Sequence, residues 1–101
     1  MNAVTIENQA GDVRITFEPA LGISCARDLR SQLEPLLSNT TSIVLDASRV
    51  ERTDAAAMQL IAAFVISARR RNVKCHWHSL SSAFRNAAAL LDLNEALGAP
   101  A

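Results

Sequence analysis

The sequence has no excess of charge and few aromatic side chains. Among its 101 residues, ten are Lys or Arg and ten are Asp or Glu, so the formal net charge at pH 7 is zero. Tyr is absent, and the aromatic residues, 4% of the chain, are Phe17, Phe64, Trp77 and Phe84. Because the chain lacks both a cationic excess and a set of rings on which bases could stack, nucleic acid is not expected as a partner.

Cysteine, glycine and long apolar runs are also scarce. Cys25 and Cys75 are too few for a disulfide framework, and both lie in apolar-patterned segments, so we expect reduced core residues. The three glycines are too far apart for a phosphate-binding loop. The first ten residues do not resemble a signal peptide, and the apolar stretch between Asp54 and Arg69 is too short to span a bilayer. We therefore expect a cytoplasmic protein without direct membrane insertion.

Apolar residues recur along the sequence at the spacings that are typical of strands and helices. Alternation over residues 4–7 and 13–17 predicts two strands, and the turn composition of residues 9–12 predicts an antiparallel hairpin. A helix is predicted from an N-cap at Ser24 to Leu36, with Pro35 bending or tightening its last turn. The run Ile43–Leu45 is apolar on both faces, which is typical of a central strand.

The second half of the chain continues this pattern. A long apolar helix is predicted from an N-cap at Asp54 to the basic run 69–71, where cations meet the negative end of the helix dipole. Residues 73–78 alternate as a strand, a helix follows a cap at Ser81 or Ser82, and a final helical turn over 94–97 ends at Gly98. The order ββαβαβαα predicts an α/β fold in one domain, with a mixed sheet and right-handed crossovers.

Catalytic groups are few. Cys25 or Cys75 with His76 or His78 would supply the residue types of a thiol hydrolase, but Cys75 and His76 are neighbours on a strand and point to opposite faces. His76 and His78 share a face and could bind one metal ion, although further ligands would have to come from scattered carboxylates. No metal site, cofactor or catalytic residue is therefore predicted, and a thiol or metal hydrolase is kept as the rival hypothesis.

A family resemblance lies between Ile43 and Leu60, where the sequence reads IVLDASRVERTDAAAMQL. This segment resembles the STAS domain, the module shared by sulphate transporters and anti-sigma-factor antagonists. The resemblance consists of an apolar strand, then Leu-Asp-Ala-Ser, a short connection and Thr-Asp-Ala-Ala-Ala-Met. In that family the helix opens with Asp-Ser-Ser-Gly-Leu or Asp-Thr-Ala-Gly-Leu, and Ala57 here replaces the glycine. Segments 71–73 and 81–93 also resemble the family. The resemblance implies a single STAS domain over residues 1–101, with helices packed mainly on one face of the sheet.

The resemblance also bears on regulation. In the antagonist branch, the Ser or Thr after the Asp is phosphorylated by a partner kinase. Ala55 occupies that position here, and its methyl group cannot accept a phosphoryl group, so the usual switch is expected to be absent. Thr53 and Ser48 are nearby hydroxyls outside the acceptor position, and we interpret them as loop or capping residues.

A non-enzymatic protein-binding module is the function that the resemblance implies. The expected contact surface is the connection 49–53 with the start of the following helix: Arg49, Glu51, Arg52, Thr53, Asp54, Ala55, Ala56 and Met58. The same apolar residues could instead pack within the domain. The candidate partners are an anti-sigma factor or its serine kinase, a chemotaxis signalling protein, or the nucleotide-binding subunit of an Mla-type phospholipid ABC transporter. A homodimer is a further option.

Overall fold

The computed structural model describes residues 4–9, 12–22 and 26–98. In chain order its elements are β1 (Val4–Gln9), β2 (Asp12–Phe17), β3 (Ala20–Leu21), α1 (Ala26–Leu33), α2 (Leu36–Asn39), β4 (Ser42–Ala47), β5 (Arg52–Thr53), α3 (Ala55–Arg70), β6 (Lys74–Leu80), α4 (Ser82–Leu90) and α5 (Asn94–Leu97). The α/β fold class is confirmed, and the predicted main elements are all present in the predicted order. The predicted cap Ser24 and the centre of the hairpin turn lie outside the described residues.

The main sheet is mixed, as the sequence predicts. Its strand order is β1-β2-β4-β6, with β1 antiparallel to β2 and the pairs β2–β4 and β4–β6 parallel. The strand β4 is therefore internal, which agrees with its continuous apolar sequence. The register between β4 and β6 shifts between Leu45 and Asp46, where the pairing of the two strands is irregular.

Three short elements were not predicted. Strands β3 and β5 form a separate two-stranded parallel sheet, so the connection 49–53 is not a simple loop. The helix predicted to run to Leu36 instead ends at Leu33, and α2 begins after Pro35. Proline lacks the N–H that would continue the ladder, and here it separates two helices rather than bending one.

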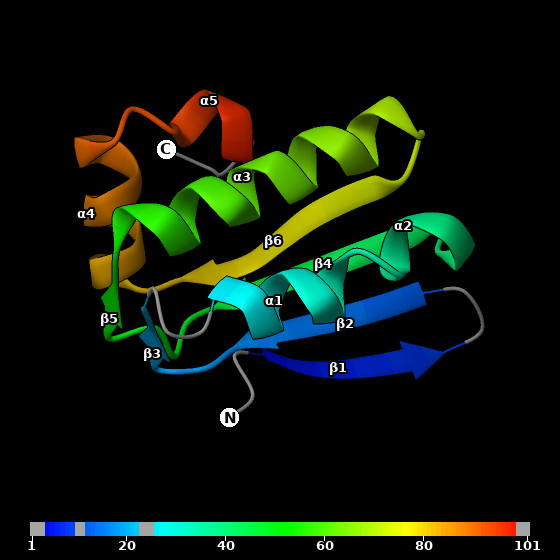
Figure 1. Cartoon of the computed structure of the whole chain (residues 1–101), viewed down its shortest axis with the longest axis horizontal. Helices are drawn as coiled ribbons and strands as arrows, with labels where there is room; N and C mark the ends of the chain where they lie inside the picture. Colours follow the sequence, from blue (N-terminus) through cyan, green and yellow to red (C-terminus); the bar gives the residue numbers. More distant parts are fainter. Residues whose placement is uncertain (1–3, 10–11, 23–25, 99–101) are drawn as a thin grey trace.

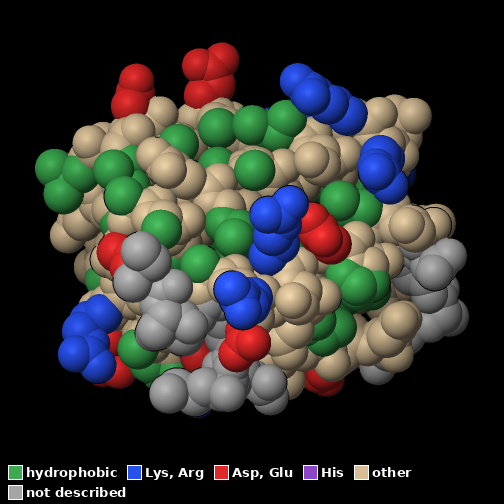
Figure 2. Space-filling view, viewed as in Figure 1, with side chains coloured by type: hydrophobic (Ala, Val, Ile, Leu, Met, Phe, Trp, Pro, Cys, Tyr) green, Lys and Arg blue, Asp and Glu red, His purple; other side chains and the backbone are tan. Residues whose placement is uncertain are grey.

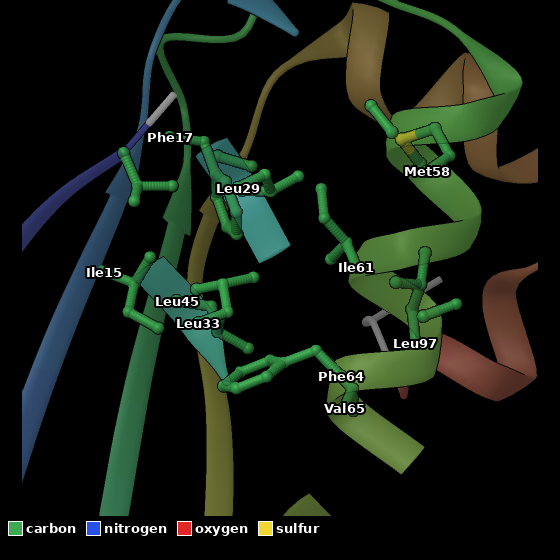
Figure 3. Packing of buried hydrophobic residues seen from close by; sticks show 14 of the residues in the cluster. Ile15, Phe17, Leu29, Leu33, Leu45, Met58, Ile61, Phe64, Val65 and Leu97 are labelled. Atoms are coloured by element: carbon green, nitrogen blue, oxygen red, sulfur yellow. The ribbon is translucent and has the colours of Figure 1, made fainter. Parts of the chain in front are cut away.

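The core lies between the sheet and the helices. Helices α1 and α3 cover one face of the main sheet, α4 stands near the start of α3, and α5 packs beside the middle of α3 (Figure 1). The side chains of Ile61 and Phe64 on α3 point toward the strands that carry Ile15 and Leu45, and Leu29 of α1 closes the same core (Figure 3). The helix α3 is buried on several sides because it packs against α1, α5 and β6, which explains its nearly continuous apolar sequence.

An aromatic cluster joins the sheet to the C-terminal helices. The rings of Phe17, Trp77 and Phe84 lie with centroids 5.2–6.5 Å apart. The Trp77 indole Nε1–H donates a hydrogen bond of 2.9 Å to the backbone oxygen of Leu97, so the half-buried ring keeps its polar atom satisfied. The last helical turn ends at Gly98, whose φ of +64° favours glycine and where a Cβ would overlap the Arg69 guanidinium.

Membrane-spanning character is not found in the part of the chain that the structure describes, since none of its helices is both long and apolar enough to cross a bilayer.

Candidate functional site

The candidate site is the segment between the end of β4 and the first turn of α3. Backbone hydrogen bonds hold this segment against β3. The N–H groups of Glu51 and Arg52 donate to the Pro19 oxygen at 2.7 and 3.0 Å, and the Asp54 N–H donates to the Leu21 oxygen at 3.2 Å. Because the β3–β5 pairing fixes the backbone, the segment presents its side chains in a defined arrangement.

Asp54 is the N-cap of α3, as the sequence predicts. Its backbone is extended, with φ −125° and ψ 176°, and its carboxylate Oδ1 accepts a hydrogen bond of 3.0 Å from the Ala57 N–H. This bond satisfies one of the free N–H groups of the first turn, and the negative charge lies at the positive end of the helix dipole.

The three apolar residues that were predicted to contact a partner differ in how much of their surface is exposed. Ala55 is exposed and Ala56 is partly exposed, so both can contact a partner. Met58 is fully buried and faces the core (Figure 3), so its prediction as a contact residue is wrong. Residue 58 lies three positions after Ala55 on a helix that packs on several sides, and the apolar pattern alone did not show which side faces solvent.

Charged side chains surround the start of α3. Arg49, Glu51 and Arg52 are all exposed. The Arg49 Nη1 lies 3.8 Å from Glu18 Oε2, and the other Glu18 oxygen accepts a hydrogen bond of 3.2 Å from the Thr5 hydroxyl. Such exposed pairs contribute little to stability, so these charges are available to a partner.

The two hydroxyls near Ala55 differ in exposure. The Thr53 Oγ1 atom is buried and has no hydrogen-bond partner among the described residues, whereas Ser48 is exposed. A kinase could not reach the buried Thr53 oxygen without a change in the packing around it. The Ser48 N–H donates to Asp46 Oδ1 at 3.0 Å, which fixes the turn that follows β4.

Asp46 has a structural role that the sequence analysis missed. It is 8% exposed, and its Oδ2 accepts a hydrogen bond of 3.1 Å from Arg14 Nη2 on the neighbouring strand β2. Burial raises the pKa of Asp46, but the hydrogen bonds from Ser48 and the charge and hydrogen bond of Arg14 outweigh it, so its net pKa is lowered. The Asp-Ala-Ser pattern therefore carries a carboxylate that ties β2, β4 and the following turn together.

The groups considered for hydrolysis are not assembled into a site in the described structure. Cys75 is partly buried, and burial raises the pKa of its thiol, an effect that the charge of Arg69 offsets only in part. His76 and His78 are exposed on β6, and among the described residues no group of three or more His, Cys, Asp or Glu side chains could hold a metal ion. Cys25 lies outside the described residues.

One further surface feature was missed by the sequence analysis. The Leu90 side chain, at the end of α4, is 87% exposed, which stands out among the large apolar residues that the structure describes. The helix α4 also packs against β5. The sequence pattern only weakly indicated that Leu90 is exposed. Leu90 and Leu91 are adjacent, and helical periodicity did not decide which of them faces the core.

Solved structures share this fold. The anti-sigma factor antagonist SpoIIAA in its unphosphorylated form superposes with a TM-score of 0.77 at 14% identity, over 92% of this chain and 84% of the other. An anti-sigma factor antagonist from Mycobacterium paratuberculosis gives 0.74 at 16% identity, over 91% and 79%. The crystal structure of Mglu superposes with a TM-score of 0.70 at 22% identity over 79% of this chain, and this chain spans only 20% of the longer Mglu chain.

Two sequence comparisons gave different results. No curated protein gives a significant match to the sequence, whereas a family model does. The family described as "Mlab, STAS domain" matches residues 4–98, a span that includes β5, the Asp54 cap and the whole of α3. On this match the chain belongs to the STAS domain family.

Proposed function

We propose that the whole chain, residues 1–101, is one STAS domain that acts without catalysis by binding a partner protein through the start of α3. STAS domains interact with other proteins, as the anti-sigma factor antagonists do. The observation that carries the proposal is the exposed Ala55 at the first residue of α3, flanked by exposed charges and preceded by the Asp54 cap. The contact residues are Arg49, Glu51, Arg52, Ala55 and Ala56, with Asp54 and Thr53 holding the backbone.

The chemistry of Ala55 supports a permanently binding-competent surface. A phosphate adds nearly two negative charges and three acceptor oxygens, and a partner that docks on a helix start would have to desolvate them. Ala55 has no oxygen to modify, and the Thr53 hydroxyl is buried. Phosphate at position 55 therefore cannot switch the surface, and its affinity depends on shape, small apolar contacts and a polar rim.

Two partner settings are favoured by different observations. The structural likeness to anti-sigma factor antagonists favours an anti-sigma factor or its serine kinase in a partner-switching cascade. The family description "Mlab" favours the second candidate, a small subunit that docks on the nucleotide-binding subunit of an Mla-type phospholipid ABC transporter. A chemotaxis signalling protein is a third setting, for which the structure adds no specific support. A cytoplasmic location fits each of the three.

The test begins with the proteins encoded by the neighbouring genes. Each is purified and titrated calorimetrically against the wild-type chain, against Ala55→Glu, and against Ala89→Glu as the matched control. Ala89 is exposed on α4, so the control makes the same chemical change elsewhere. We expect Ala55→Glu to stay folded and to weaken partner binding at least about tenfold, while Ala89→Glu binds as wild type does. Unchanged affinity of Ala55→Glu would remove the start of α3 from the contact surface.

A further inference from the structure

A groove runs between α1 and α3, away from the start of α3. It has a volume of about 480 Å³ and opens to solvent. Its floor is apolar and includes Leu33, Leu37, Leu60 and Phe64. Leu37 and Leu60 are only partly buried, so the described structure leaves apolar surface uncovered here.

The α3 wall of the groove has small or uncharged side chains. Gln59, Ala63 and Ser67 recur every four residues along it. Eight residue steps along a helix correspond to about 12 Å, or a little more than two turns. Small side chains at Ala63 and Ser67 allow another backbone to approach closely, and helix axes pack at about 8–10 Å when the contact residues are small.

The charges around the groove are unequal at its two ends. On the α1 side, Arg30 Nε and Glu34 Oε1 lie 2.9 Å apart and neutralise each other. Beyond Ser67, the same face of α3 continues to Arg70 and Arg71, which are exposed and form no ion pair within the described part of the chain. Basic side chains are visible over this end of α3 in Figure 2, on the face that shows α1 and α3. One end of the groove is therefore positively charged.

We propose that this groove binds an amphipathic helix of a partner protein, whose apolar side chains enter it and whose acidic end meets Arg70 and Arg71. The groove length suits a helix of two to three turns with anchors at positions i, i+4 and i+7. An open groove cannot enclose a drug-sized molecule as small-ligand pockets do, which favours a helix over a small ligand. The surface is distinct from the start of α3, so the protein offers two separate contacts.

The probes are synthetic stapled helices of three turns with Leu at i, i+4 and i+7. One set has Glu residues at one end, and a matched set has Lys at the same positions. Binding to the full-length, ¹⁵N-labelled chain is followed by amide shift changes. We expect the Glu peptides to bind at least about fivefold more tightly than the Lys peptides, with shifts centred on residues 59–71 and 30–37. No binding, shifts centred elsewhere, or equal binding of both sets would overturn the proposal.

Three variants locate the contact. Ala63→Glu should abolish binding by filling the groove with a charge, whereas Ala89→Glu on α4 should not change it. The double variant Arg70→Glu and Arg71→Glu should reverse the preference so that the Lys peptides bind more tightly. The control Arg85→Glu makes one such charge reversal on α4 and should leave the preference for the Glu peptides in place. All of these side chains are exposed, so the single variants should have thermal midpoints near that of wild type. The double variant should have a modestly lower midpoint, because two carboxylates replace two cations at the negative end of the α3 dipole.

Each result of the variants decides the proposal. If Ala63→Glu binds the Glu peptides as wild type does, the groove is not the site. If the wild-type chain elutes as a dimer by light scattering and Ala63→Glu makes it a monomer, the groove belongs to a second copy and the proposed partner helix is wrong. Because Ala55 takes no part in these peptide titrations, failure here leaves the proposed function of the α3 start untouched.

Discussion

The Asp54 carboxylate accepts a hydrogen bond of 3.0 Å from the Ala57 N–H, and this bond fixes the start of α3 beside the exposed Ala55. The same hydrogen bond therefore stabilises α3 and fixes the position of the candidate contact surface. Asp54 therefore holds the end of the helix in place at the residue before Ala55.

Replacing Asp54 by Ala should lower the free energy of unfolding by about 0.5–2 kcal/mol, because the cap hydrogen bond and the favourable dipole interaction are both lost. Denaturant unfolding at neutral pH measures the change. Asp54→Asn is the matched control, since Asn caps nearly as well, and it should retain most of the stability. Equal stability of Asp54→Ala and wild type would show that the hydrogen bond does not act as a cap.

Replacing Leu45 by Ala should cost about 2–5 kcal/mol, because Leu45 is fully buried on the internal strand β4 and its loss leaves a cavity. Thermal and denaturant unfolding give the value. Val44→Ala, on the opposite face of the same strand and only partly buried, should cost clearly less. An unmoved thermal midpoint for Leu45→Ala would contradict the central position of β4.

Acid should destabilise the protein in part through Asp46. Its pKa in the folded state lies below the ordinary value of 3.8, so its contribution to stability is complete above that value and is lost as the pH falls through the folded pKa. Unfolding measured from pH 6 to pH 2 should therefore be less pH-dependent in Asp46→Asn than in wild type. An identical pH dependence of the two proteins would mean that the Arg14 and Ser48 contacts do not favour the charged form.

Incubation with a serine kinase encoded beside the gene should leave the first turn of α3 unphosphorylated, because Ala55 has no hydroxyl and the Thr53 oxygen is buried. Mass spectrometry of the intact and digested protein checks this, with Thr53 and Ser48 as the residues to inspect. An Ala55→Ser variant is the positive control for kinase competence. Phosphate on Thr53 of the wild-type chain would show that the switch has moved rather than disappeared.

Cys75 should react with thiol reagents more slowly than a free cysteine, because burial raises its pKa and keeps the thiol protonated at neutral pH. The measurement uses Cys25→Ser, so that a single thiol is followed, with the unfolded protein as the reference rate. Rapid labelling of the folded protein, or stoichiometric zinc in the purified wild-type chain, would instead support the thiol or metal hydrolase hypothesis.

The features that were predicted correctly from the sequence depend on residues close together in the chain. The caps at Asp54 and Ser81 depend on a side chain and an N–H three residues later, and both are present in the structure. The alternation of β2 and β6 and the apolar run of β4 predicted strands for the same reason, since period two follows directly from the backbone. These features need no knowledge of distant residues.

Contacts between distant residues were not predictable in the same way. Strands β3 and β5 are two residues each, too short for any periodicity, and they exist because residues 20–21 and 52–53 meet in space. The Arg14–Asp46 pair joins residues 32 positions apart, and nothing in either local pattern links them.

Residue type and local periodicity were enough to predict the α/β class, the order of the main strands and helices, and the α3 cap. The residue type alone shows that the side chain at position 55 has no hydroxyl. Packing, in contrast, places Met58 in the core, covers the Thr53 hydroxyl and leaves a groove open beside Ala63. Exposure cannot be derived from a local pattern, because it depends on which neighbours pack against a residue. An apolar helix such as α3 presents similar side chains on every side, and the elements that pack against it select which of them a partner can reach.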